Sequence, residues 1–244
     1  MKKLVIVLIL FIGAMPVMAE DLQNVSPYYG SGLCTYKQFQ CIKINRGQTW
    51  ENLFPNPEQR DIVQRLNRTY NYLSSGKEIV VPRDLDHITL LDVAPFPQKI
   101  DEHEKQIIID QEKLAWGAYN EDGQLVHWGP ISSGRDKCSD SNRSCRTMSG
   151  IFRVFSKENE RCKSDVYPIG KGGAKMPYCM YFHKGFALHG AEDIPGYRAS
   201  HGCVRMFIRD AKWLNEQFTD ISNEANQYMG TKVVVRPLNS VEKL

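Results

Sequence analysis

The odd number of cysteines is the feature that most constrains how this chain folds. Six of them can be joined in disulfides if the protein is exported, whereas a seventh has no partner left within the chain. No two are spaced as C-x-x-C, so neither a zinc ribbon nor a thioredoxin-like motif is supported. The seven cysteines stand at positions 34, 41, 138, 145, 162, 179 and 203.

The amino-terminal segment predicts export. Lys2 and Lys3 precede an apolar run over residues 4–12, and Val17-Met18-Ala19 offers a small-residue cleavage site. This arrangement is typical of a secretory signal peptide, and the run is too short to span a membrane. We therefore expect residues 1–19 to be removed and the protein to cross the inner membrane into the periplasm, where disulfides form.

Spacing along the chain suggests how the cysteines pair. Cys34/Cys41 and Cys138/Cys145 share the same gap of six residues, which suits the closure of a short loop, and Cys162/Cys179 is the remaining couple. Six cysteines allow fifteen pairings, so this connectivity rests on proximity alone. It leaves Cys203 free.

Composition excludes several classes of protein. With 244 residues and 42% apolar residues, the chain is long enough for a buried core and is neither disordered nor a polytopic membrane protein. Loss of residues 1–19 removes two lysines and no acid, which takes the net charge from +3 to +1. No basic block or recognition-helix pattern accompanies this charge, so nucleic acid is not expected as a partner.

A small module is expected over residues 43–82, after a polar linker over residues 20–42. Residues 41–44 alternate like a strand, and residues 49–54 form a short helix. Asn56 is expected to cap a second helix, with Pro57 at its first position and Gln59 completing a capping box. Residues 78–82 form the closing strand.

A mainly β domain with one helix is expected over residues 104–237, after a proline-containing linker at 83–103 and before a tail at 238–244. Alternating apolar residues predict the strands, an Asn-Glu-Asp-Gly turn at 120–123 joins two of them, and apolar residues at helical spacing predict the helix at 209–218. The expected strands are 107–109, 114–119, 124–131, 152–155, 185–189 and 232–235.

The string Ser200-His201-Gly202-Cys203 suggests a nucleophile. A thiol attacks as thiolate, so a catalytic cysteine needs a neighbouring imidazole. His189 ends an apolar strand from which its ring can approach Cys203 and hold a thiolate–imidazolium pair, with the Gly190 carbonyl orienting it. We therefore expect His189 to act as the base. The competing interpretation is an inert, buried cysteine.

The residues around Cys203 suggest two supporting roles. Gly202 allows close approach of a substrate, and the amides of His201, Gly202 and Cys203 are expected to converge on a developing oxyanion. Arg205 is expected to bind a substrate carboxylate or to support the loop.

Two family resemblances follow from these motifs. Thirteen residues separate His189 from Cys203, and Ser200-His201-Gly202-Cys203-Val204 with this spacing resembles the signature of the YkuD-type L,D-transpeptidases. Ser132-Ser133-Gly134 and Thr147-x-x-Gly150-x-Phe152 extend the match, which spans about residues 104–237. The module at 43–82 resembles a LysM domain. The resemblances imply a YkuD-type sandwich or barrel-like catalytic domain preceded by a small strand–helix–helix–strand domain.

The YkuD resemblance implies a peptidoglycan enzyme associated with the cell wall. In that family the cysteine attacks the carbonyl of the third stem residue of a tetrapeptide, expels D-Ala, and passes the thioester to an amine. This implies Cys203 as nucleophile, His189 as proton acceptor and donor, and the Gly190 carbonyl as its orienter. His201 and Gly202 would shape the oxyanion loop, and no metal or cofactor is implied. Candidates for substrate contact are Ser200, Tyr178, Tyr181 and Arg205.

The LysM resemblance implies contact with glycan chains. Members of that family bind N-acetylglucosamine chains in a groove, which corresponds here to Gly47–Leu53 and Asn71–Ser75. A spacer with the same fold and no affinity for sugar is equally consistent with the sequence.

Several alternatives stay open at this point. Water as acceptor would make the protein an L,D-carboxypeptidase. With an outer-membrane protein or lipoprotein as acceptor, the enzyme would attach that acceptor protein to the wall. A non-catalytic protein binding peptidoglycan through the LysM-like module belongs to another class. Cys179 stands close to the site, where the family often has an aromatic residue, and as a free thiol it would alter the pocket.

Overall fold

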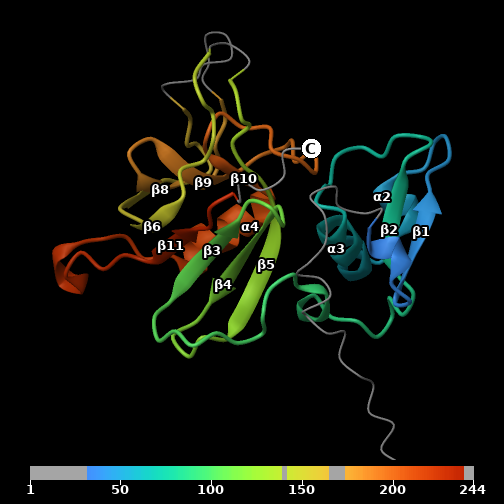
Figure 1. Cartoon of the computed structure of the whole chain (residues 1–244), viewed down its shortest axis with the longest axis horizontal. Helices are drawn as coiled ribbons and strands as arrows, with labels where there is room; N and C mark the ends of the chain where they lie inside the picture. Colours follow the sequence, from blue (N-terminus) through green and yellow to red (C-terminus); the bar gives the residue numbers. More distant parts are fainter. Residues whose placement is uncertain (1–31, 139–141, 165–173, 239–244) are drawn as a thin grey trace, which may run out of the picture.

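A nine-stranded sheet forms the larger part of the structure, a computed structural model that describes residues 32–138, 142–164 and 174–238 (Figure 1). The strands lie in the order β6-β11-β3-β4-β5-β10-β9-β8-β7. Neighbours are antiparallel, except that β11 runs parallel to β3 and β10 parallel to β9. The bounds are β3 Gln106–Asp110, β4 Ala115–Tyr119, β5 Leu125–Ser132, β6 Gly150–Arg153, β7 Ser156–Lys157, β8 Met180–His183, β9 Phe186–Gly190, β10 Val204–Met206 and β11 Lys232–Val235.

The sheet curls until strands far apart in the sheet order meet. Phe152 of β6 packs on Phe182 of β8, with ring centroids 5.4 Å apart. Helix α4 (Ile208–Trp213) and the π-helical turn that continues it (Leu214–Phe218) complete the enclosed core. Ala211, Leu214 and Phe218 are buried in this core, so the predicted apolar face of the helix is confirmed. The mainly β fold with one helix in this region is confirmed as well.

The amino-terminal module has the predicted order of elements. Strand β1 (Phe39–Lys43) pairs antiparallel with β2 (Glu78–Pro82), and α2 (Trp50–Leu53) and α3 (Pro57–Leu66) lie between them in sequence. A short 3-10 turn, η1 (Leu33–Thr35), precedes β1. Kinship of this module with LysM domains stays a prediction.

The caps of the two module helices differ in part from expectation. Asn56 accepts hydrogen bonds from the amides of Glu58 and Gln59, as a cap at this position should. The Gln59 side chain instead donates to Asp86 at 2.7 Å, so the predicted capping box is wrong. A reciprocal box forms at α2, between Thr49 and Asn52.

The expected linker at 83–103 packs into the molecule rather than tethering two domains. It contains the 3-10 turn η2 (Leu91–Val93), and Val93 and Phe96 are fully buried. They belong to one hydrophobic cluster shared by the module and the sheet, so the two parts form a continuous core. From the module come Leu33, Phe39, Ile62, Leu66 and Val80, and from the sheet Ile108, Ala115, Tyr119, Leu125 and Trp128.

A buried ion pair strengthens this junction. Arg65 of α3 donates to both carboxylate oxygens of Asp210 in α4, at 2.7 and 2.8 Å, and their side chains are only 2% and 1% exposed. Gly129 of β5 makes room for the pair, because a Cβ there would lie 2.2 Å from an Asp210 oxygen. Arg65 also donates to the Trp128 carbonyl at 2.7 Å.

The three predicted disulfides are confirmed. Cys34 pairs with Cys41, Cys138 with Cys145, and Cys162 with Cys179. Among the cysteines, all of which the structure describes, Cys203 is free. Cys179 is fully buried and bonded, so the alternative of a free thiol at this position does not apply.

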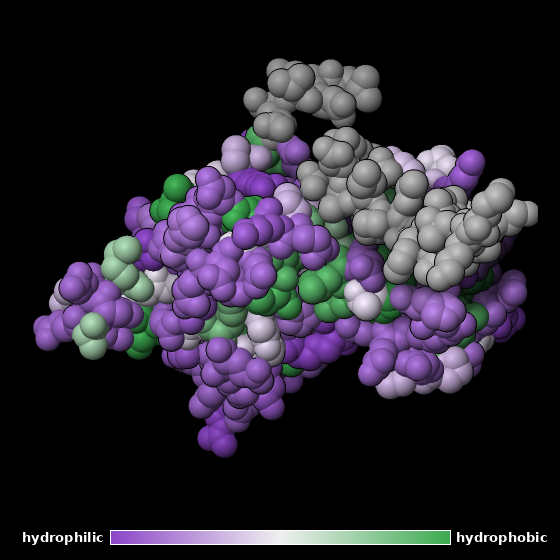
Figure 2. Space-filling model, turned by 90° about the horizontal axis from the view of Figure 1, so that it is seen from below, coloured by the Kyte–Doolittle hydropathy of each residue, from purple (hydrophilic) through white to green (hydrophobic). Residues whose placement is uncertain are grey.

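Three sequence predictions lie outside the described residues: the signal peptide at 1–19, the linker at 20–31 and the tail at 239–244. Within the described part of the chain, every helix is too short or too polar to cross a membrane. The surface is mainly hydrophilic on the face drawn in Figure 2, where a projection at the left corresponds to the arm around η4 (Glu224–Asn226).

Candidate active site

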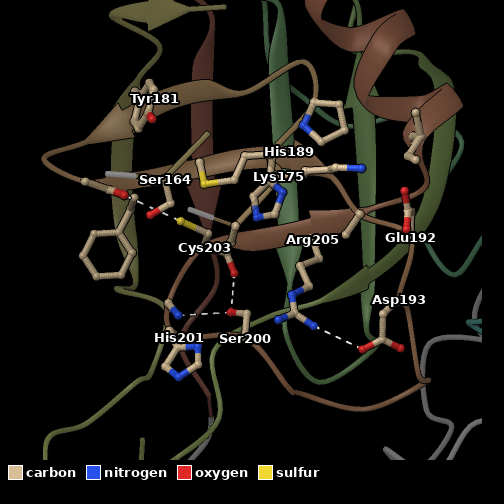
Figure 3. A pocket seen from close by; sticks show the side chains of 18 of the residues that line it. Ser164, Lys175, Tyr181, His189, Glu192, Asp193, Ser200, His201, Cys203 and Arg205 are labelled. Atoms are coloured by element: carbon tan, nitrogen blue, oxygen red, sulfur yellow. Dashed lines mark hydrogen bonds and ion pairs between the residues drawn. The ribbon is translucent and has the colours of Figure 1, made fainter. Parts of the chain in front are cut away.

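The free cysteine lines a cleft of about 990 Å³. Cys203 immediately precedes β10, and β10 runs parallel to β9 with Arg205 opposite His189. The strand pair therefore brings His189 next to Cys203 at the centre of the pocket, as Figure 3 shows. Arg205 and His201 line the same cleft, while Tyr181 reaches it from β8.

The His189 ring is held in one orientation and one tautomer. Its Nδ1 lies 2.9 Å from the Gly190 carbonyl oxygen, which can only accept, so Nδ1 carries the proton. Burial lowers the pKa of His189 to about 4, the Gly190 hydrogen bond opposes this shift, and the positive charge of Arg205 adds to it. At neutral pH the ring is uncharged and Nε2 is free of a proton.

The thiol of Cys203 is also neutral at rest. Burial raises its pKa above the ordinary value, while a backbone hydrogen bond from Ala187 and the charge of Arg205 act in the opposite direction. The thiol donates a weak hydrogen bond to the Gly185 carbonyl at 3.6 Å. Both shifts favour the neutral forms of the two groups, in contrast to the resting thiolate–imidazolium pair expected from the sequence.

The loop before Cys203 is held by two hydroxyl groups. Ser200 Oγ donates to the Cys203 carbonyl at 2.5 Å and accepts from the Gly202 amide at 3.0 Å. Thr147 Oγ1 donates to the Gly202 carbonyl at 2.7 Å and accepts from the Gly134 amide at 2.9 Å. These bonds fix the turn from which the nucleophile projects.

Gly202 has a conformation that a side chain would strain. Its φ is +129°, and a Cβ there would lie 2.9 Å from the Phe186 ring. The predicted need for glycine at this position therefore has a steric reason in the fold. Its amide donates to Ser200 Oγ in the resting structure, and a part for Gly202 in an oxyanion site stays a prediction.

The predicted substrate-contact residues separate into two groups. Ser200, Tyr181 and Arg205 line the cleft. Tyr178 instead packs against the core inside the curled sheet. Ser200 borders the cleft but is only 2% exposed, and its hydroxyl is used inside the loop. Sequence reasoning placed all four together, because the packing of Tyr178 against the core cannot be deduced from spacing.

Sequence reasoning missed the acidic residues of the cleft. Asp193 lies on the segment after β9, where its carboxylate oxygen is 3.3 Å from Nη1 of Arg205. Glu192 and Glu158 also line the cleft. No motif singled them out, because their proximity to Cys203 depends on the curl of the sheet.

The described residues place one group of metal-ligand types together, Glu158 with Cys162 and Cys179. The two cysteines form a disulfide, so neither offers a thiolate to a metal ion.

Comparisons with known proteins identify the family of the sheet domain. The model of the YkuD family, described as the L,D-transpeptidase catalytic domain, matches residues 104–235. YciB of Bacillus subtilis (strain 168), which is named provisionally as an L,D-transpeptidase, is 30% identical over 134 residues. That match takes in 49% of this chain and 65% of YciB, so the chain spans less than two thirds of this relative.

One solved structure shows the same fold. The L,D-transpeptidase of Xylanimonas cellulosilytica DSM 15894 (residues 123–326) superposes with a TM-score of 0.50 at 24% identity, covering 72% of this chain and 78% of that one. An L,D-transpeptidase of Stackebrandtia nassauensis has a TM-score of 0.43 at 23% identity, over 59% of this chain and 60% of that one. Because the family model covers more than half of its length, this chain belongs to the YkuD family of L,D-transpeptidase catalytic domains.

Proposed function

We propose that the protein is a peptidoglycan L,D-transpeptidase with Cys203 as its nucleophile. One observation carries the proposal: the free thiol lines a cleft beside a histidine whose Nδ1 is fixed on the Gly190 carbonyl. This arrangement presents an unprotonated Nε2 toward the cleft, which is what a general base for a neutral thiol requires. Family membership and the wall-linked chemistry of that family support the same substrate class.

The first half-reaction transfers the acyl group to sulfur. As Cys203 Sγ attacks the carbonyl carbon of the third stem residue, His189 Nε2 takes the thiol proton. The C–N bond to the terminal D-Ala then breaks, and His189 returns the proton to the leaving amine. A thioester on Cys203 and free D-Ala remain. Because both groups are neutral at rest, proton transfer accompanies attack rather than preceding it.

The second half-reaction passes the acyl group to an amine. The amine loses a proton to His189 Nε2 as it attacks the thioester, the C–S bond breaks, and Cys203 regains the proton. We propose that the backbone amide of Cys203 and the loop at His201 face the developing oxyanion, and that Arg205 receives a substrate carboxylate. Tyr181 also lines the cleft.

Incubation with a disaccharide-tetrapeptide tests the proposal. We expect release of D-Ala and a mass increase on Cys203 equal to the acyl group. Cys203→Ala is the control, and release of D-Ala by this variant at the parent rate would refute the mechanism.

Product analysis identifies the acceptor. We propose an amine, giving a 3→3 cross-link or attachment of a protein to the wall. With a stem peptide, a lysine-bearing protein and water competing, amide products support this proposal, and tripeptide alone would identify an L,D-carboxypeptidase instead.

The remaining sequence expectations complete the proposal. Residues 1–19 act as a cleaved signal, residues 43–82 as a LysM-like module and residues 104–237 as the catalytic domain, working in the periplasm at the wall. Retention of the full mature chain on insoluble peptidoglycan, compared with a Gln48→Ala variant in the expected groove, measures whether the module binds sugar. Equal retention of both proteins argues against sugar binding in that groove.

A further inference from the structure

The turn after α3 meets the segment that follows His189. Asn71 donates from Nδ2 to Asp193 Oδ1 at 2.7 Å, and its Oδ1 accepts from the Ile194 amide at 3.0 Å. The neighbouring Tyr70 hydroxyl donates to the Ala191 carbonyl. One asparagine side chain of the module thus holds two successive residues of the catalytic domain.

Asp193 connects this contact to the cleft. Its Oδ1 is held by Asn71, while its Oδ2 lies 3.3 Å from Nη1 of Arg205. Arg205 lines the cleft with Cys203 and stands opposite His189 on the neighbouring strand. A continuous chain of contacts therefore runs from the module through Asp193 to the arginine beside the nucleophile.

The ion pair with Arg205 is not enough by itself to fix the orientation of the Asp193 side chain. Its side chain is 62% exposed, and an ion pair with one exposed partner holds a side chain weakly in water. The amide group of Asn71 fixes the carboxylate and the backbone of the next residue together, which a salt bridge alone would not do. Arg205 itself is only 22% exposed, so its guanidinium has little freedom once Asp193 is fixed.

The rest of the junction makes the module a firm support. The module shares a hydrophobic cluster with the sheet, and the buried Arg65–Asp210 pair lies in the same junction. Trp50 of α2 donates to the Asn71 carbonyl at 2.8 Å, which ties the turn back to the module's own core. The backbone of Asn71 is therefore held by the module, while its side chain binds Asp193 and Ile194 of the catalytic domain.

We propose that Asn71 is a positioning residue of the transpeptidase: it holds Asp193, which orients Arg205 to receive a carboxylate of the stem peptide. This inference rests on the proposed function. It assigns the module a role in the catalytic unit, separate from any affinity for glycan. The side chain of Asn71, in the segment expected to line the sugar groove, is occupied by the catalytic domain.

The test compares Asn71→Ala with Asn45→Ala in the full mature chain. Asn45 is exposed in the same module and lies outside both segments of the expected groove. Asn71→Ala should raise KM for a tetrapeptide roughly tenfold with kcat little changed, since it removes a hydrogen bond to a charged group. Iodoacetamide titration of Cys203 and the melting temperature identify any loss of folded protein, which would lower the apparent kcat instead. Asn45→Ala should match the parent.

A double variant decides whether Asn71 acts through Asp193. Asp193→Ala alone should reproduce the rise in KM, and Asn71→Ala/Asp193→Ala should be no worse than Asp193→Ala. If Asn71→Ala folds poorly, Asp193→Asn, which lies on an exposed segment, tests the same series of contacts from Asn71 through Asp193 to Arg205. An unchanged KM in Asn71→Ala, or effects of the two variants that multiply, would overturn the inference. If the parent neither releases D-Ala nor forms an adduct on Cys203, it is the proposed function that fails.

Discussion

His189 and Arg205 are register partners on the parallel strands β9 and β10. A permanent positive charge therefore lies beside the ring that must stay neutral to accept a proton. Burial lowers the pKa of His189 to about 4, and the charge of Arg205 acts in the same direction. The arginine thus has an electrostatic effect on the base in addition to its proposed contact with substrate.

The acid limb of the pH profile follows from this pairing. Acylation requires neutral His189, so activity should be full at pH 6 and fall only as pH approaches about 4. Arg205→Gln removes the neighbouring charge and should move the limb upward, still below the ordinary histidine value because burial remains. The measurement is kcat/KM for D-Ala release between pH 3.5 and 8. An acid limb near pH 6.5 whose midpoint is the same in the parent and in Arg205→Gln would contradict the proposal that His189 is neutral at rest.

The reactivity of the thiol provides an independent check. Burial raises the pKa of Cys203, so little thiolate exists at neutral pH without substrate. Iodoacetamide should alkylate native Cys203 at pH 7 more slowly than it alkylates the same cysteine in urea with the three disulfides intact. Mass spectrometry follows both rates. Faster alkylation of the native protein would indicate a preformed ion pair.

Gly202→Ala should disable the site without unfolding the protein. The added Cβ would meet Phe186 at 2.9 Å in a backbone conformation unsuited to alanine, and the loop must shift to relieve the contact. A displacement of the nucleophile of about 1 Å lowers the rate roughly a hundredfold. Gly76→Ala is the control outside the cleft, because its φ of +87° is also unsuited to alanine but a Cβ there has no atom within 4 Å. Similar kcat/KM values in the two variants would argue against this steric constraint.

Arg65→Ala should be strongly destabilising. Although burial acts to lower the pKa of Arg65, Asp210 and Asp61 raise it above the ordinary value, so the guanidinium stays charged. Removing it leaves Asp210 buried without its partner, at a cost of roughly 3–5 kcal/mol in the free energy of unfolding. Urea unfolding measures the loss. The exposed Arg46→Ala in the same module should change stability by less than about 0.5 kcal/mol. A small effect of Arg65→Ala would mean that module and sheet are weakly coupled.

Much of the local structure could be predicted because it depends on neighbours in sequence. The strands at 232–235 and 78–82 follow from alternating or continuous apolar residues, and the turn at 120–123 from its asparagine and glycine. Strands β7, β8 and β10 were missed, because two, four and three residues are too few for a period to stand out. The segment at 83–103 was taken for a linker because its prolines outweighed Val93 and Phe96, which are buried only through the tertiary fold.

By itself, the sequence determined which cysteine is free, which histidine accompanies it and which family the motif resembles, since each depends on residue identity and short spacing. Only the tertiary structure decided the charge state of that pair, because burial on adjacent strands sets the two pKa values. It also decided that Ser200 and the Gly202 amide serve the loop. The contact of Asn71 with Asp193 joins residues 122 positions apart, and only a packed junction between module and sheet brings them together.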